Sequence, residues 1–144
     1  MRDYRKGSHT VYDISFHFVW ITKYRYHVLR GPVATRVRDI LREVCMAHEV
    51  KILKGVVSKD HVHMLVSVPP TLAPSRLAGL MKGKSSHKIQ QEFPEIRKRY
   101  WGQHFWARGY FCATTGTVTD EMIKAYIGNH TAHDSDSDEF EIEN

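Results

Sequence analysis

The 144-residue chain has little of what would place it in a special class of protein. It has two cysteines, five prolines and nine glycines, and no internal repeat. No apolar run approaches the roughly 20 residues that a membrane-spanning helix needs. The charged N-terminus leads into no apolar segment, so we expect no signal peptide. With 42% hydrophobic and 26% charged residues, the composition predicts one ordinary globular domain.

The two cysteines, Cys45 and Cys112, form neither a Cys-x-x-Cys pair nor a zinc-finger spacing. A chain with two scattered cysteines and no signal peptide favours a reducing, cytoplasmic location. We therefore expect both side chains to fill core volume.

Charge is unevenly distributed along the chain. Lys and Arg number 21 and Asp and Glu 16, for a net charge of +5. Residues 134–144 hold six of the sixteen acids and no Lys or Arg, which leaves residues 1–133 with ten acids and a net charge of +11. A body this basic favours a polyanionic partner, most often nucleic acid. The acidic segment 134–144 is expected to be a disordered tail.

Hydrophobic periodicity predicts four strands and three helices. The strands are expected over residues 10–22, 51–58, 61–68 and 104–114, and the helices over residues 33–49, about 74–93 and about 120–130. Residues 1–9 are expected to be a mobile arm, and residues 23–30 and 97–99 basic loops. The order β-α-β-β-α-β plus a final helix predicts an α+β, ferredoxin-like domain over residues 1–133. Its four-stranded antiparallel sheet would carry two helices on one face and leave the other face for a site. This fold hosts many functions, so the fold alone does not decide among them.

A His-x-His pair, His61 and His63, lies in the third expected strand. Residues i and i+2 of a strand point to the same face, so the two imidazoles should lie side by side while Val62 faces the other way. Such a pair is half of a metal site. The alternative is that both are ordinary histidines on a sheet surface.

A second pair, Tyr126 and His130, is spaced i and i+4 in the last expected helix, which places both on one side of it. Each alone is an ordinary helix residue. Together, near the histidine pair, they would supply a nucleophile and a third ligand.

These motifs, in this order, resemble the single-tyrosine transposases of small bacterial insertion sequences that move as single-stranded DNA, members of the His-hydrophobic-His superfamily. The resemblance covers roughly residues 9–130. It rests on Val-Trp-Ile-Thr-Lys-Tyr-Arg (19–25), Asp-His-Val-His-Met-Leu-Val-Ser-Val-Pro-Pro (60–70), Leu-Met-Lys-Gly-Lys-Ser-Ser (80–86), His-Phe-Trp-Ala-Arg-Gly-Tyr (104–110) and Tyr-Ile-Gly-Asn-His (126–130).

The resemblance implies a mechanism. His61, His63 and His130 would hold a divalent ion, Mg²⁺ or Mn²⁺, that polarises the scissile phosphate. Tyr126 would attack and form a 5′-phosphotyrosine, leaving a 3′-hydroxyl. Many relatives have Gln where His130 stands, and a third imidazole favours manganese or zinc over magnesium.

The resemblance also implies partners: single-stranded DNA with hairpins at the element ends, and a second copy of the chain in a homodimer. Phosphate contacts are expected from basic residues of the arm, the first loop and the second helix, namely Arg5, Lys6, His9, Lys23, Arg25, Lys82, Lys84 and Lys88. Base stacking is expected from Tyr24, Trp101, Phe105 and Trp106.

Two other functions stay open from the sequence. One is a domesticated relative that nicks repeated palindromes without moving itself. The other is a non-catalytic nucleic-acid-binding module of the RRM type, which would want aromatic residues where the third expected strand has histidines.

Overall fold

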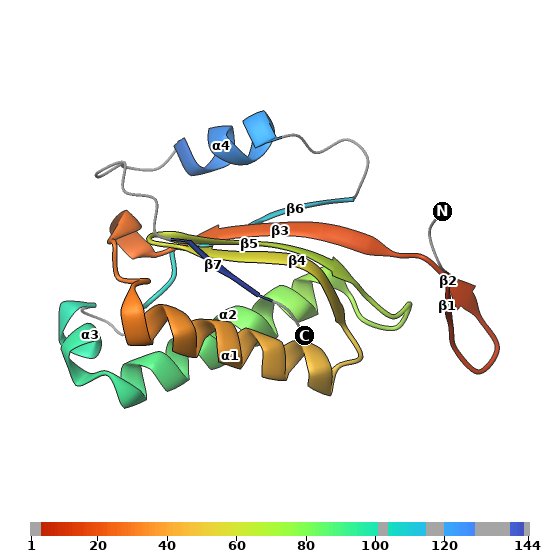
Figure 1. The fold of residues 1–144 in the computed structure, drawn as a ribbon, viewed down its shortest axis with the longest axis horizontal. Coiled ribbons are helices and arrows are strands. Elements are labelled where there is room, and N and C mark those ends of the chain that lie inside the picture. The colour runs from red at the N-terminus through yellow and green to blue at the C-terminus, as the bar shows by residue number, and fades with distance from the viewer. Residues whose placement is uncertain (1–3, 101–103, 115–119, 129–138, 143–144) are drawn as a thin grey trace.

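Three layers build the molecule: a helix, a sheet and a pair of packed helices (Figure 1). The structure is a computed structural model and describes residues 4–100, 104–114, 120–128 and 139–142. No helix in these ranges is long and apolar enough to cross a membrane.

The central sheet has five antiparallel strands in the order β6-β3-β5-β4-β7. Its strands are β3 (Ser15–Ile21), β4 (Lys51–Ser58), β5 (His61–Ser67), β6 (Phe111–Thr114) and β7 (Glu139–Glu141). β4 and β5 form a hairpin through Lys59 and Asp60, the two residues between the strands expected over 51–58 and 61–68. Without β7, the remaining order β6-β3-β5-β4 is the one expected of the ferredoxin-like fold. The predicted α+β fold class is confirmed.

Helices α1 (Gly31–Ala47) and α2 (Pro74–Glu92) pack together on one face of the sheet. Each has a proline in its first turn, where the missing N–H costs no hydrogen bond. The buried stripe of α1 contains Val33, Val37, Ile40, Leu41 and Val44, as its spacing predicts. The short α4 (Asp120–Gly128) lies over the opposite face (Figure 1).

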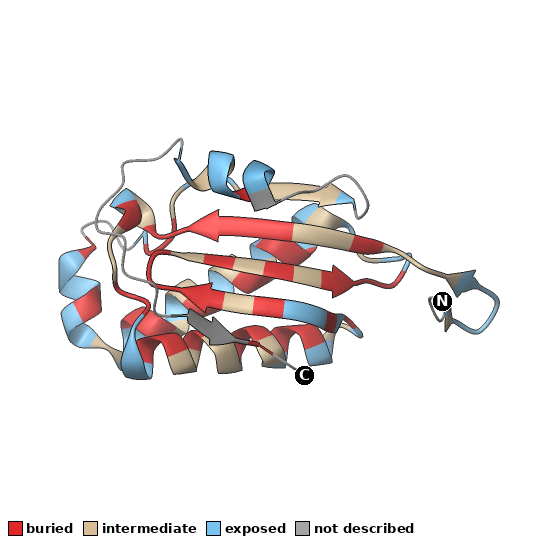
Figure 2. Ribbon diagram, turned by 45° about the horizontal axis from the view of Figure 1, so that its top comes forward, coloured by how far each residue is buried: buried red, intermediate tan, exposed pale blue. Residues whose placement is uncertain are grey.

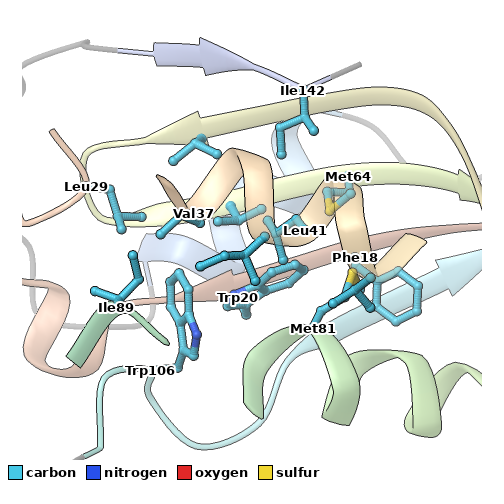
Figure 3. Close-up of a cluster of buried hydrophobic side chains, with 14 of the residues drawn as sticks. Phe18, Trp20, Leu29, Val37, Leu41, Met64, Met81, Ile89, Trp106 and Ile142 are labelled. Carbon is cyan, nitrogen blue, oxygen red and sulfur yellow. The ribbon is translucent and has the colours of Figure 1, made fainter. Parts of the chain in front are cut away.

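The core lies between the sheet and the pair α1 and α2. Alternate strand residues point into it: Phe18, Trp20 and Met64 are fully buried (Figure 3), and so are Val62 and Val66. Trp20 meets Trp106 edge to face, with ring centroids 5.8 Å apart. Buried positions alternate along β5 up to Val66 in Figure 2, which leaves His61, His63 and Leu65 to the other face, whereas the last four residues of β3 are all buried.

Three local expectations are wrong. Residues 5–6 are not a mobile arm, because β1 (Arg5–Lys6) pairs with β2 (Val11–Tyr12) and the Arg5 guanidinium donates to the carbonyls of Ser67 and Glu49. Residues 97–99 are not a loop but the end of helix α3 (Pro94–Arg99), whose basic last turn suits the helix dipole. The strand expected over 104–114 is regular only from Phe111; before it, Trp106 makes a single bridge to Thr22.

The acidic tail is also more ordered than its charge predicts. Residues 139–142 are not disordered: β7 pairs with the edge strand β4, and the Ile142 N–H donates to the Gly55 carbonyl at 2.7 Å. Ile142 is buried, and a Cβ on Gly55 would lie 2.7 Å from the Ile142 Cβ. The missing side chain of Gly55 therefore makes room for one apolar residue in an acidic segment. Residues 134–138 lie outside the described residues.

Candidate active site

The two histidines of the His-x-His motif lie side by side on the α4 face of the sheet. His61 and His63 are half-buried, whereas Val62 and Met64 between and beside them are buried in the core. The shared face that the sequence predicts is therefore present. His63 lies opposite Val19 of β3, and Val19 in turn lies opposite Phe111 of β6. These three side chains form one row across the sheet.

Asp60 fixes the orientation of the first histidine. His61 Nδ1 lies 2.8 Å from Asp60 Oδ1. Burial alone would raise the pKa of the Asp60 carboxyl, but hydrogen bonding with His61 and the charges of His61 and Arg25 outweigh burial and lower it. Asp60 is thus a carboxylate that can accept a hydrogen bond from His61 Nδ1. With Nδ1 directed at Asp60, Nε2 is the ring nitrogen of His61 that can face a ligand, as in the carboxylate–histidine pairs of metal sites.

His17 is a third histidine of this face, and the sequence reasoning missed it. Its Nδ1 lies 3.2 Å from His63 Nε2, and the two rings stack with centroids 5.4 Å apart. Burial and the nearby charge of Lys54 lower the pKa of His17, so its imidazole is neutral near pH 7. The period-two pattern of β3 could have placed His17 on this face, but cross-strand register was needed to place it beside His63.

Helix α4 brings Tyr126 over the same face. The Tyr126 ring contacts Phe111, with centroids 5.8 Å apart, and Phe111 ends the row that begins at His63. Burial raises the pKa of Tyr126, so its phenol is protonated near pH 7. The predicted partner on this helix, His130, lies outside the described residues.

The donors of this face fit part of a metal site. Within the described ranges, no three His, Cys, Asp or Glu side chains gather around one point that could hold an ion. Three imidazoles lie on this face, and one of them, that of His61, is backed by a carboxylate, which is a frequent arrangement behind metal-bound histidine. His61 and His63 could therefore supply two ligands, and a third must come from elsewhere.

Comparison with known proteins agrees with this geometry. The family model described as "Transposase IS200 like" matches residues 10–130. The transposase of insertion sequence element IS200 from Salmonella typhimurium is 33% identical over 142 residues, which is 99% of this chain and 93% of that protein. The chain belongs to the IS200-like transposase family. It is therefore a DNA transposase, an enzyme that cleaves and rejoins DNA.

Three further similarities bear on the fold and the family. The ISDra2 transposase TnpA of Deinococcus radiodurans is 32% identical over 132 residues, covering 92% of this chain and 93% of that one. A crystal structure of a transposase from the same organism superposes with a TM-score of 0.82 at 32% identity, over 89% and 99% of the two chains. The REP-associated tyrosine transposase bound to a REP hairpin shares the fold, with a TM-score of 0.57 at 15% identity over 90% and 68%.

The basic residues expected to bind DNA in this transposase fall into two groups. Arg5 and Arg25 are occupied in the fold, Arg5 on backbone carbonyls and Arg25 in an ion pair with Asp60. Lys82 donates to the carbonyls of Ala107 and Gly109 at 2.9 and 2.7 Å, and its burial lowers its pKa. Lys88 lies 3.5 Å from Glu43. Of the other expected residues, Lys6, His9 and Lys84 are exposed and Lys23 is half-buried.

Two of the aromatic residues expected to stack on bases are core residues instead. Phe105 is fully buried and Trp106 nearly so, with the Trp106 Nε1–H donating to Ser85 Oγ. They are buried because their irregular segment folds under the sheet against α2. Tyr24 is 58% exposed, so its ring can be reached by a base, and its stacking role stays a prediction. Trp101 lies outside the described residues.

A basic cavity of about 610 Å³ lies between α2 and the segment before β6 in the IS200-like transposase. Lys23 and Lys82 line it, together with His104 and Arg108, two residues that the sequence reasoning did not single out. The charges of Lys23 and Lys82 could not have indicated a cavity. Its walls come from three segments that are distant in sequence: Lys23, the middle of α2 and residues 104–109.

Proposed function

We propose that this transposase cleaves and rejoins single-stranded DNA at element ends that carry hairpins, through a 5′-phosphotyrosine on Tyr126. The observation that supports this most directly is that the helix with Tyr126 lies over the sheet face that carries the histidine pair, with Tyr126 against Phe111 and Asp60 orienting His61. The proposal includes a homodimer, because the family resemblance implies one.

The chemistry suits a tyrosine. In the cleavage step, the Tyr126 oxygen forms a bond to phosphorus, and the bond from phosphorus to the 3′ oxygen breaks. The phenol loses one proton and the 3′ oxygen gains one, so the step is balanced. The phosphodiester energy is kept in the enzyme–DNA bond, and a 3′-hydroxyl can later rejoin the strand without ATP.

The protonated phenol must be activated in place. A free tyrosine has a pKa of about 10, and burial raises the pKa of Tyr126 further. Alignment and positive charge must therefore supply much of the rate. A divalent ion, Mg²⁺ or Mn²⁺, held by His61, His63 and His130 would polarise the scissile phosphate.

Of the two alternatives, a nickase of repeated palindromes would share this chemistry. The 33% and 32% identities to transposases of insertion elements, against 15% to the REP-associated protein, favour the mobile-element function. Family membership argues against a non-catalytic RRM-type module.

The test is adduct formation. The protein is mixed with a single-stranded oligonucleotide that carries a hairpin and a flanking sequence from its own element ends, with Mg²⁺ or Mn²⁺. We expect a denaturation-resistant protein–DNA band that disappears with chelator and in Tyr126→Phe, while Tyr126→Phe still binds the oligonucleotide. Tyr4→Phe, an exposed tyrosine of the N-terminal segment, is the matched control and should retain the band. An adduct with Tyr126→Phe would show that another residue is the nucleophile.

A second test asks which subunit of the proposed homodimer supplies the tyrosine of each site. Tyr126→Phe and His63→Ala are each inactive under the proposal. If each site combines the histidines of one subunit with the tyrosine of the other, mixing and re-equilibrating the two variants restores adduct formation. If each subunit uses its own tyrosine, the mixture stays inactive.

A further inference from the structure

We propose that Arg25 is a positioning residue that ties the tyrosine helix α4 to His61 through Asp60. The sequence suggested a phosphate contact for Arg25, and the structure places its guanidinium elsewhere. This inference rests on the proposed function of Tyr126 and His61, and it concerns how α4 is held against the histidine face of its own chain.

The contacts run without a break from His61 through Asp60 and Arg25 to α4. Arg25 Nε lies 3.0 Å from Asp60 Oδ2, and the other oxygen of that carboxylate holds His61 Nδ1 at 2.8 Å. Arg25 Nη1 donates to the carbonyl of Ile127 at 3.2 Å. Ile127 directly follows Tyr126 near the C-terminal end of α4, where helix carbonyls lack partners within the helix. A cation is favoured there by the helix dipole.

Burial protects this series of contacts from water. The side chains of Arg25 and Asp60 are 10% and 2% exposed, so water cannot easily replace either partner. The Arg25 guanidinium reaches its two acceptors through two different nitrogens of its planar fork, Nε to Asp60 and Nη1 to Ile127. A lysine at position 25 would keep the charge but would have to reach both acceptors from a single nitrogen.

The backbone around Arg25 is held in a strained form. Tyr24 and Arg25 have φ of +61° and +51°, a left-handed conformation that non-glycine residues rarely adopt in succession. Neighbouring hydrogen bonds enforce it: the Arg25 N–H donates to the Thr22 carbonyl, and the Thr22 hydroxyl to the Tyr26 carbonyl. Strain kept by a well-bonded loop is typical of sites that must aim a side chain, and here it directs Arg25 toward Asp60 and α4.

The test compares variants by amide hydrogen exchange and by DNA assays. Arg25→Gln leaves the buried Asp60 carboxylate without its arginine, so the double variant R25Q/D60N, which removes both charges, is measured beside it. We expect exchange in residues 120–128 to become at least about tenfold faster in both, while residues 61–67 keep their protection. Adduct formation should fall about 10- to 100-fold, as for other residues that orient a ligand, with an unchanged Kd for the hairpin oligonucleotide. Arg25→Lys should lie between the wild type and Arg25→Gln in both readouts.

The matched control is Arg36→Gln, which removes an arginine that forms a two-point contact with Glu92 between α1 and α2, away from α4. It should leave exchange in residues 120–128 unchanged. Unchanged exchange there in Arg25→Gln, with a weaker Kd and a shallower salt dependence, would make Arg25 a phosphate contact and overturn the proposal. Equal loss of protection in residues 61–67 would also overturn it. The exchange measurement needs neither DNA nor Tyr126, so it decides on Arg25 even if Tyr126→Phe still forms an adduct.

Discussion

The two faces of the sheet are built from neighbouring residues and have opposite properties. The face toward α1 and α2 is apolar and dry, with Met64 fully buried. The face toward α4 carries His17, His61 and His63, all half-buried and hydrogen-bonded to one another or to Asp60. A strand alternates its side chains, so one segment, residues 61–67, contributes to both faces. Stability and chemistry can therefore be changed separately by substitutions one residue apart.

The largest expected effect is on chemistry, from His63→Ala. Under the proposed mechanism His63 is a ligand of an activating ion, and its loss should slow adduct formation by about 10²- to 10⁴-fold, because such an ion would contribute several kcal/mol to the transition state. The free energy of unfolding should change by less than about 1 kcal/mol, since the side chain is half-buried. Single-turnover adduct assays and urea unfolding measure the two effects. A variant with normal adduct formation would remove His63 from the site.

Met64→Ala, one residue further on, should do the opposite. It leaves a cavity in the core and should lower the free energy of unfolding by about 2–5 kcal/mol. At a temperature where the variant is folded, its adduct formation should stay within a few-fold of wild type. A loss as large as that of His63→Ala in the folded variant would contradict the separation of the two faces.

A smaller effect on stability is expected at the edge of the sheet, where β7 covers β4. Ile142→Ala removes the buried side chain that packs over Gly55, and should lower the free energy of unfolding by about 1–3 kcal/mol. Amide exchange should rise first in residues 55–58, whose edge β7 covers. If exchange in this segment is unchanged, the tail does not protect the edge of the sheet in solution.

The smallest expected effect concerns pH. Burial raises the pKa of Cys45 in the core to about 12, against an ordinary value of 9.0. Above about pH 9 the unfolded chain releases this proton and the folded chain keeps it, so the free energy of unfolding falls as pH rises. The slope is at most about 1.4 kcal/mol per pH unit for one group. Cys45→Ala should lose this contribution, so the stability difference between wild type and variant should narrow from pH 8 to pH 10. A constant difference would contradict the pKa shift.

Local patterns predicted much of the molecule because they report local physics. The alternation in residues 61–68 places His61 and His63 on one face and Val62 on the other, and the stripe from Val33 to Val44 gives α1 its buried side. The predictions failed where distant partners decide. Phe105 and Trp106 look like exposed base-stacking residues until α2 covers them, and the acidic tail looks disordered until Ile142 reaches Gly55.

The sequence by itself determined the fold class, the face that carries the histidine pair and the family to which the transposase belongs. Periodicity and motif order are properties of single segments, and they can be read without knowing what packs against them. Only the tertiary structure decided that His17 lies against His63, and that Arg25 joins Asp60 and α4 instead of facing solvent. Those contacts span 35 to 102 residues of chain, and their existence depends on strand register, helix placement and a loop held in a strained form.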